Sequence, residues 1–225
     1  MGGTKHRYYL VGLSILLLTT LLHSADSNVE PTHTWPQFRG PDGLANAGDQ
    51  DIPLHFGQTE NLLWRTEVLK GHSSPIILGR NLFLTGFKDE TRIMLAIDRF
   101  SGQTLWEKKA EAPATEDFTH RLASPAESTP CTDGKHVYFY FGNYGLIALN
   151  FDGSVAWEKR LPRPSTGMGT GTSPILSGES LILNRDGTDE PWIRIPEKNY
   201  GSTHVSVTTV AMPPPFFGIT DCGQN

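Results

Sequence analysis

The sequence predicts an all-β fold, organised as a partial β-propeller with about two and a half four-stranded antiparallel blades. Three observations support this prediction. Short apolar runs are separated by many of the 23 Gly and 16 Pro residues, a hairpin pattern occurs twice, and a second pattern built around a proline occurs three times. Gly and Pro end strands and form turns, and repeated units of roughly 45 to 55 residues have the length of propeller blades.

The hairpin pattern covers residues 96–108 and 148–159. Both segments have an apolar strand that ends in Asp or Asn, a turn that contains Gly, and a strand that contains Trp. The matching positions are Asp98, Gly102 and Trp106 in the first copy and Asn150, Gly153 and Trp157 in the second. The last strand occurs a third time at 61–67, around Trp64, without the first half of the hairpin before it. We therefore expect two hairpins and one additional strand.

The second pattern starts at Pro75, Pro130 and Pro174. A small or hydroxyl-bearing residue precedes each proline, and a strand, a Gly turn and another strand follow it. The prolines lie 55 and 44 residues apart. Together the two patterns place blade one at about 71–109 and blade two at about 124–160, with blade three beginning near residue 170.

The three repeated tryptophans, Trp64, Trp106 and Trp157, are expected to dock neighbouring blades. A buried indole covers roughly 150–250 Å², enough to join two adjacent sheets. An aromatic platform for a sugar or a quinone is the alternative, but one Trp in each unit favours packing. We assign the same structural role to Asp98, Gly102, Asn150 and Gly153.

These residues give the sequence a family resemblance. Ala96, Asp98, Gly102 and Trp106 resemble the blade signature of the pyrroloquinoline-quinone-type (PQQ-like) β-propeller repeat family, in the quinoprotein alcohol dehydrogenase-like superfamily. The segment 35–43 is similar to the lead-in of secreted bacterial members, so the resemblance covers about 34–193. The family includes quinoprotein alcohol dehydrogenases and the propeller subunit of the outer-membrane β-barrel assembly machinery.

The resemblance implies PQQ and calcium only for the dehydrogenase members, which oxidise alcohols at a stacked quinone. Their adjacent pair of cysteines is missing, because Cys131 and Cys222 are far apart in this chain. No catalytic residue or calcium ligand matches residue by residue. We therefore predict no catalytic, cofactor-binding or metal-binding residues. A disulfide between Cys131 and Cys222 is left open.

Three further segments have a chemical and a structural interpretation. Residues 184–190 contain oxygen ligands that suit hard cations, but an Asp-Gly turn is favoured. Residues 167–171 are rich in Gly, but a proline and a strand follow where a phosphate site needs a helix. His72 stands beside two serines, and we expect it to form loop hydrogen bonds.

The repeat stops after Ile193. Residues 194–225 lack the Asp, Gly turn and Trp of a further hairpin, and we expect a divergent or disordered tail. A truncated copy of a longer propeller is the expected explanation, and a short repeat that assembles with other chains is the alternative. In both cases open sheet edges would bind other proteins or a second copy.

The N-terminus has the features of an export signal. Lys5 and Arg7 precede an apolar run of about 13 residues, which is short for a membrane span of about 20, and small residues follow at 24 and 25. We expect residues 1–25 to be a cleaved signal peptide, with an uncleaved anchor as the alternative. The protein would then be periplasmic or secreted in a bacterium, without stable membrane insertion.

The sequence predicts an exported, non-enzymatic scaffold for protein interactions. The net charge of −5 and the lack of a long basic run argue against nucleic acid as a partner. Two alternatives stay open. The chain is a fragment of a PQQ-dependent or related oxidoreductase, or it is a non-functional truncated gene product.

Overall fold

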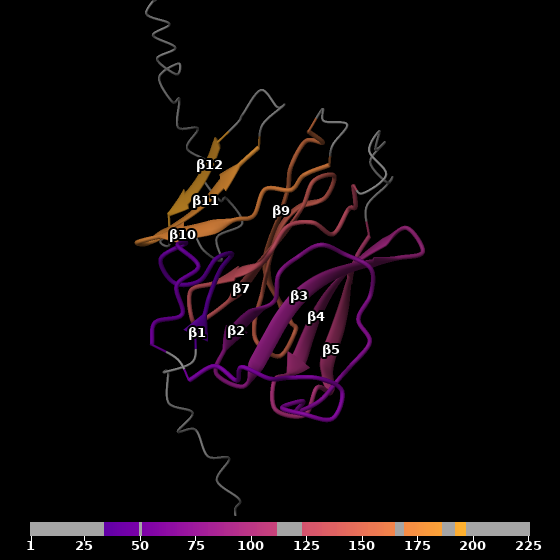
Figure 1. Ribbon diagram of the computed structural model, residues 1–225. Coiled ribbons are helices and arrows are strands. Elements are labelled where there is room, and N and C mark those ends of the chain that lie inside the picture. Colours follow the sequence, from indigo (N-terminus) through magenta and orange to yellow (C-terminus); the bar gives the residue numbers. More distant parts are fainter. Residues whose placement is uncertain (1–33, 50, 112–122, 165–168, 186–191, 197–225) are drawn as a thin grey trace, which may run out of the picture.

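The structure is a computed structural model that describes residues 34–49, 51–111, 123–164, 169–185 and 192–196. These residues form strands, turns and loops, and no helix occurs among them. The strands make three antiparallel sheets that lie side by side in an open arrangement (Figure 1). The predicted all-β class and the partial propeller are therefore confirmed.

Blade one is a sheet with the strand order β1-β2-β3-β4-β5. Its strands are β1 (Thr34–Trp35), β2 (Ile76–Leu78), β3 (Asn81–Lys88), β4 (Thr91–Asp98) and β5 (Thr104–Ala110). The last four form the expected blade. The short strand β1 is an addition that sequence analysis missed, and it pairs with β2 through Thr34 and Leu78.

Blades two and three repeat the plan of β2 to β5. Blade two contains β6 (Cys131–Thr132), β7 (Val137–Phe141), β8 (Gly145–Leu149) and β9 (Val155–Arg160), and blade three contains β10 (Ile175–Ser177), β11 (Ser180–Asn184) and β12 (Trp192–Pro196). Blade three thus has three strands among the described residues. The last of them continues to Pro196, three residues past the expected end of the repeat region.

Successive side chains of a strand point to opposite faces of its sheet, so blade two packs against a different neighbour on each face. In blade two, Phe139 and Phe141 enter a core shared with blade one, which contributes Phe83 and Met94. Tyr138 and Tyr140 enter a second core, shared with blade three. Blade two is therefore packed on both faces, and its two central strands, β7 and β8, are buried along their whole length.

The strand expected at 61–67 is wrong as secondary structure, since these residues lie outside every strand. A strand needs hydrogen bonds to a neighbouring strand, and no described strand pairs with this segment. The segment instead covers one face of blade one, where Trp64 and Leu69 pack against Leu84 and Leu95.

Several sequence predictions lie outside the described residues. They are the signal peptide at 1–25, residues 197–225 of the tail, and Cys222 with its disulfide. Within the described ranges, no helix is long and apolar enough to cross a membrane.

Candidate functional site

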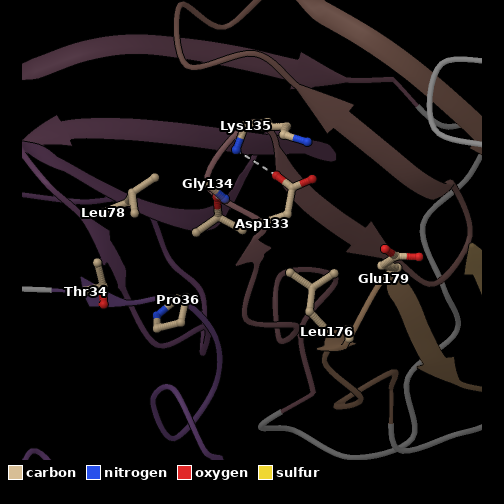
Figure 2. A pocket seen from close by; sticks show the side chains of 10 residues that line it. Thr34, Pro36, Leu78, Asp133, Gly134, Lys135, Leu176 and Glu179 are labelled. Atoms are coloured by element: carbon tan, nitrogen blue, oxygen red, sulfur yellow. Dashed lines mark hydrogen bonds between the residues drawn. The ribbon is translucent and has the colours of Figure 1, made fainter. Parts of the chain in front are cut away.

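A cleft lies where the turns of three blades meet. Its volume is about 530 Å³, and it is lined by Thr34, Pro36, Leu78, Thr132, Asp133, Gly134, Lys135, Leu176, Gly178 and Glu179. Leu78 ends β2 of blade one, Asp133 and Lys135 belong to the turn between β6 and β7, and Glu179 belongs to the turn between β10 and β11. Figure 2 shows these side chains around a common opening. Residues of all three blades thus share one cleft, with leucines from blades one and three and charged groups from blades two and three.

The N-terminal segment 34–37 holds the three blades at this cleft. It pairs with blade one through β1. The backbone N–H of Thr132 in blade two donates to the carbonyl of Pro36 at 2.9 Å. The backbone N–H of Leu176 in blade three donates to Oε1 of Gln37 at 3.1 Å. One short segment therefore makes a hydrogen bond to each blade, and this fixes the relative positions of the cleft walls.

Asp133 organises the central turn of the cleft. One carboxylate oxygen accepts the backbone N–H groups of Lys135 at 2.8 Å and His136 at 2.7 Å, and the other accepts the hydroxyl of Tyr138 at 2.6 Å. Burial raises the pKa of Asp133, but these hydrogen bonds and the nearby His136 outweigh burial and lower its pKa below the ordinary value. The carboxylate is therefore ionised, and its oxygens are used in the hydrogen bonds of the turn between β6 and β7.

The cleft does not fit PQQ with calcium. Calcium takes six to eight oxygen ligands, whereas the lining supplies two carboxylates, and Asp133 already accepts three hydrogen bonds. No aromatic side chain lines the cleft. Among the described residues, no three His, Cys, Asp or Glu side chains group as a metal site would require.

Two predicted tryptophans lie against the turn of the next unit. The Nε1–H of Trp64 donates to the carbonyl of Arg99 at 2.7 Å, and its ring lies directly over Gly102, where a Cβ would be 2.6 Å from Cδ2. The Nε1–H of Trp106 donates to the carbonyl of Phe151 at 2.8 Å, and its ring lies over Gly153. The two contacts are equivalent, because Arg99 and Phe151 follow the matching residues of the two hairpins.

Both glycines have the backbone that these turns require. Their φ angles are +73° at Gly102 and +83° at Gly153, in the left-handed region that favours glycine. The same two residues also leave room for the indole rings. The pattern of Gly in the turn and Trp in the preceding unit thus has a single geometric cause.

Asp98 and Asn150 end their strands in different ways. One carboxylate oxygen of Asp98 accepts the backbone N–H groups of Phe100 and Ser101, and the other accepts Nε of Arg80. Burial raises the pKa of Asp98, but these hydrogen bonds outweigh burial and lower the pKa below the ordinary value. Asn150 instead donates its side-chain amide to the hydroxyl of Ser154 at 2.9 Å.

Trp157 is placed differently from the other two. It is buried in the core between blades two and three, with its ring centroid 5.9 Å from that of Tyr138. A next hairpin turn would follow β12, outside the described residues. A docking contact of the kind made by Trp64 and Trp106 is therefore not described for Trp157.

Hydroxyl residues before the prolines form a contact that sequence analysis missed. The backbone N–H of Ser74 donates to Oγ1 of Thr129 at 2.9 Å, and the backbone N–H of Thr129 donates to Oγ of Ser173 at 3.0 Å. Each blade is thereby linked to the next at the same repeat position. The small-or-hydroxyl residue before each proline was the signal that could have revealed it.

The remaining candidate groups lie apart from the cleft. His72 donates its backbone N–H to the carbonyl of Ala126, and its Nδ1 lies 3.9 Å from a carboxylate oxygen of Glu127. Residues 167–168 of the Gly-rich segment and residues 186–190 of the Asp-rich segment are outside the described residues. Cys131 is buried, and burial together with Asp133 raises the pKa of its thiol well above the ordinary value.

The family model described as outer membrane protein assembly factor BamB matches residues 49–189. This match covers more than half of the chain. The protein therefore belongs to this family of PQQ-like β-propeller repeat proteins, which confirms the expected resemblance. The search of curated proteins gave no significant match.

Solved structures of related architecture include three larger propellers. BamB from Moraxella catarrhalis is 15% identical with a TM-score of 0.45, and the match covers 61% of this chain and 37% of that one. A europium-containing methanol dehydrogenase is 12% identical with a TM-score of 0.45, covering 63% and 25%. Quinohemoprotein alcohol dehydrogenase from Comamonas testosteroni is 12% identical with a TM-score of 0.49, covering 76% and 27%. This chain thus spans about a quarter to a third of their length.

Proposed function

We propose that the protein is an exported, non-enzymatic scaffold in the bacterial periplasm, and that the cleft between its three blades binds an extended segment of a partner protein. The family model supports this proposal, because its description names an assembly factor of the outer membrane. The cleft supplies the place at which a partner would bind.

The observation that carries the proposal is the composition of the cleft. Leu78, Pro36 and Leu176 offer apolar contacts, while Lys135 and Glu179 offer charges of opposite sign at the same opening. Protein interfaces combine an apolar centre with a polar rim in this way. The hydrogen bonds of the segment 34–37 hold the walls in place, and a pre-organised site loses less entropy on binding.

Site-specific photo-crosslinking tests the proposal. A photoreactive residue replaces Glu179 in the exported full-length chain, and covalent adducts formed in living cells are identified by mass spectrometry. The same residue at Lys88, which is exposed at the end of β3, serves as the control. We expect one defined protein adduct at position 179 and none at position 88.

Charge reversal makes the test specific. Lys135→Glu, in a chain that also carries the photoreactive residue at 179, is expected to reduce the adduct at least several-fold because it reverses the rim charge that remains once Glu179 is replaced. An equal yield of the same adduct at positions 88 and 179, or an adduct that is insensitive to Lys135→Glu, would contradict binding at the cleft.

A further inference from the structure

Strand β12 of blade three has one edge without a described partner, whereas the equivalent strands β4 and β8 are paired on both edges. In blade one, β4 pairs with β5 through Ala96 and Trp106. In blade two, β8 pairs with β9 through Ala148 and Trp157. In blade three, β12 pairs with β11, and no described strand pairs with its other edge. Such an edge binds an added strand readily.

The segment 61–67 has the sequence of the fourth strand, which blade three does not have among the described residues. Its Trp64 corresponds to Trp106 and Trp157, and its ring already lies over the turn of the following blade, as the ring of Trp106 does. The segment therefore occupies the position of a fourth strand from a blade that would precede blade one. It has the sequence and the place of a strand, but no strand of the described ranges pairs with it.

The segment and β12 lie at opposite ends of the arc. The segment packs on the face of blade one that carries Leu84 and Leu95, whereas blade two packs on the other face of blade one. Blade three follows blade two on its far side, and Figure 1 shows β10 to β12 at one end of the three sheets. One chain therefore cannot pair its segment 61–67 with its own β12 while the three blades keep these packing contacts.

The segment and the residues before it carry an exposed apolar surface. Large hydrophobic side chains here are between 49% and 90% exposed, and they are Ile52, Leu54, Phe56, Leu62, Leu63 and Val68. Exposed apolar groups often mark interaction sites, and these six side chains all lie within the stretch 52–68. Leu62 and Leu63 lie within the strand-like segment itself.

We propose that the segment 61–67 of one copy adds to β12 of a second copy as its fourth strand, so that the chain associates head to tail. This inference does not rest on the proposed function, because the cleft takes no part in the contact. The two earlier blades define the expected register. Ala96 and Ala148, which face a tryptophan, correspond to Arg194 in blade three, since Phe83, Tyr138 and Ile182 are their equivalent partners on the neighbouring strand.

The register places Arg194 opposite Trp64 of the second copy. Arg194 is exposed on β12 and donates Nε to Ser180. The Trp64 ring lies over Gly102 of its own chain and is only partly buried. An arginine over an indole is a favourable cation–π pair. Arg194 occupies the position that Ala96 and Ala148 have in the earlier blades. Its guanidinium would pair with the ring of Trp64 from the second copy.

Head-to-tail contacts either close into a ring or continue into an open chain. Two copies of this three-sheet arc hold six blades, within the range of about four to eight in closed propellers. A pair of copies is thus the smallest assembly in which both open edges are paired.

Sedimentation velocity of the exported full-length chain tests the inference. We expect a species of two or more copies. Leu63→Asp and Arg194→Glu are each expected to convert it to monomer, since they damage the two sides of the contact. Leu44→Asp alters a side chain that is 71% exposed but outside this apolar surface and outside the strand-like segment, and it is expected to leave the mass unchanged. Circular dichroism verifies that all variants keep their strands.

Mixing the two damaged variants distinguishes a head-to-tail contact from other association. Leu63→Asp retains an intact β12, and Arg194→Glu retains an intact segment 61–67. A mixture is therefore expected to form a one-to-one complex that neither variant forms alone. A wild-type chain that stays monomeric, association that persists in both variants, or a mixture without complex would overturn the inference. A defined adduct at position 179 in a monomeric chain would leave the proposed scaffold function standing.

Discussion

Blades two and three are built from the same repeat, but they differ in how many neighbours they have. Blade two places aromatic rings on both faces, Phe139 toward blade one and Tyr138 toward blade three. Blade three packs Leu181 and Leu183 against blade two, while its other face carries Ile182 and the exposed Arg194. A blade of this repeat is therefore not an independent unit, because half of its core belongs to the next blade.

The largest expected effect lies in the core between blades one and two. Phe139→Ala removes a fully buried ring that contacts Trp106 edge-on, and it should cost about 3–5 kcal/mol of unfolding free energy. Ile182→Ala, on the outer face of blade three, should cost about 1 kcal/mol because the side chain is only half-buried. Urea denaturation measures both. Equal costs would mean that blade three is covered on its outer face as well.

Gly153 of blade two and Gly178 of blade three allow a comparison between a turn that the neighbouring blade covers and a turn that is uncovered. Gly153 has a φ of +83° and lies under Trp106, so Gly153→Ala should cost about 2–3 kcal/mol. Gly178 has a φ of +54° with nothing within 4 Å of an added Cβ, and Gly178→Ala should cost about 1 kcal/mol. The difference between the two urea midpoints isolates the contact with Trp106. Identical midpoints would show that the ring moves aside freely.

The hydrogen bond from the backbone N–H of Ser74 to the hydroxyl of Thr129 is expected to join blades one and two. Thr129→Val removes the acceptor of the Ser74 N–H while keeping the shape of the side chain, and it should cost about 1–2 kcal/mol because a donor loses its partner. Ser74→Ala is the control, since its hydroxyl accepts no hydrogen bond from a described residue, and it should stay within about 0.5 kcal/mol. A cost for Thr129→Val as small as that of the control would argue against this link between blades.

The smallest expected effect is the pH dependence that comes from one turn of blade two, which contains Asp133 where blade three has Ser177. The pKa of Asp133 is lower in the folded protein than the ordinary value of about 3.9. The ionised carboxylate therefore contributes stability above that value, and this contribution is lost as the pH falls through the folded pKa.

Asp133→Asn should make the loss of stability between about pH 5 and pH 3 shallower than in the wild type. Ser177→Ala should leave the slope unchanged. Urea midpoints across this range provide the measurement. Parallel slopes for wild type and Asp133→Asn would show that the turn does not depend on the charge of this residue.

Much of the fold could be predicted because the repeats carry their own local signals. The hairpins from Ala96 to Trp106 and from Ala148 to Trp157 were predicted from alternation and turn residues, and they correspond to β4–β5 and β8–β9. Strand β1 could not be predicted in this way. It has two residues and exists only because Thr34 meets Leu78, which is far away in the chain.

The candidate cleft was missed for a related reason. Asp133, Lys135 and Glu179 lie in turns, where their residue types are ordinary and indicate only a change of direction. Their importance arises because turns of successive blades converge. The repeated proline pattern contained the signal, since equivalent positions in successive blades must lie at the same end of the propeller.

The sequence by itself determined the period of the repeat, the alternation that gives each blade two apolar faces, and the pairing of a Gly turn with a Trp. These features depend on residues close together in the chain. Only the tertiary structure decided that the segment 34–37 joins three blades, that the segment around Trp64 is not a strand, and that β12 keeps an edge without a described partner. Hydrogen bonds between distant strands determine all three, and a strand exists only where another strand is present to complete it.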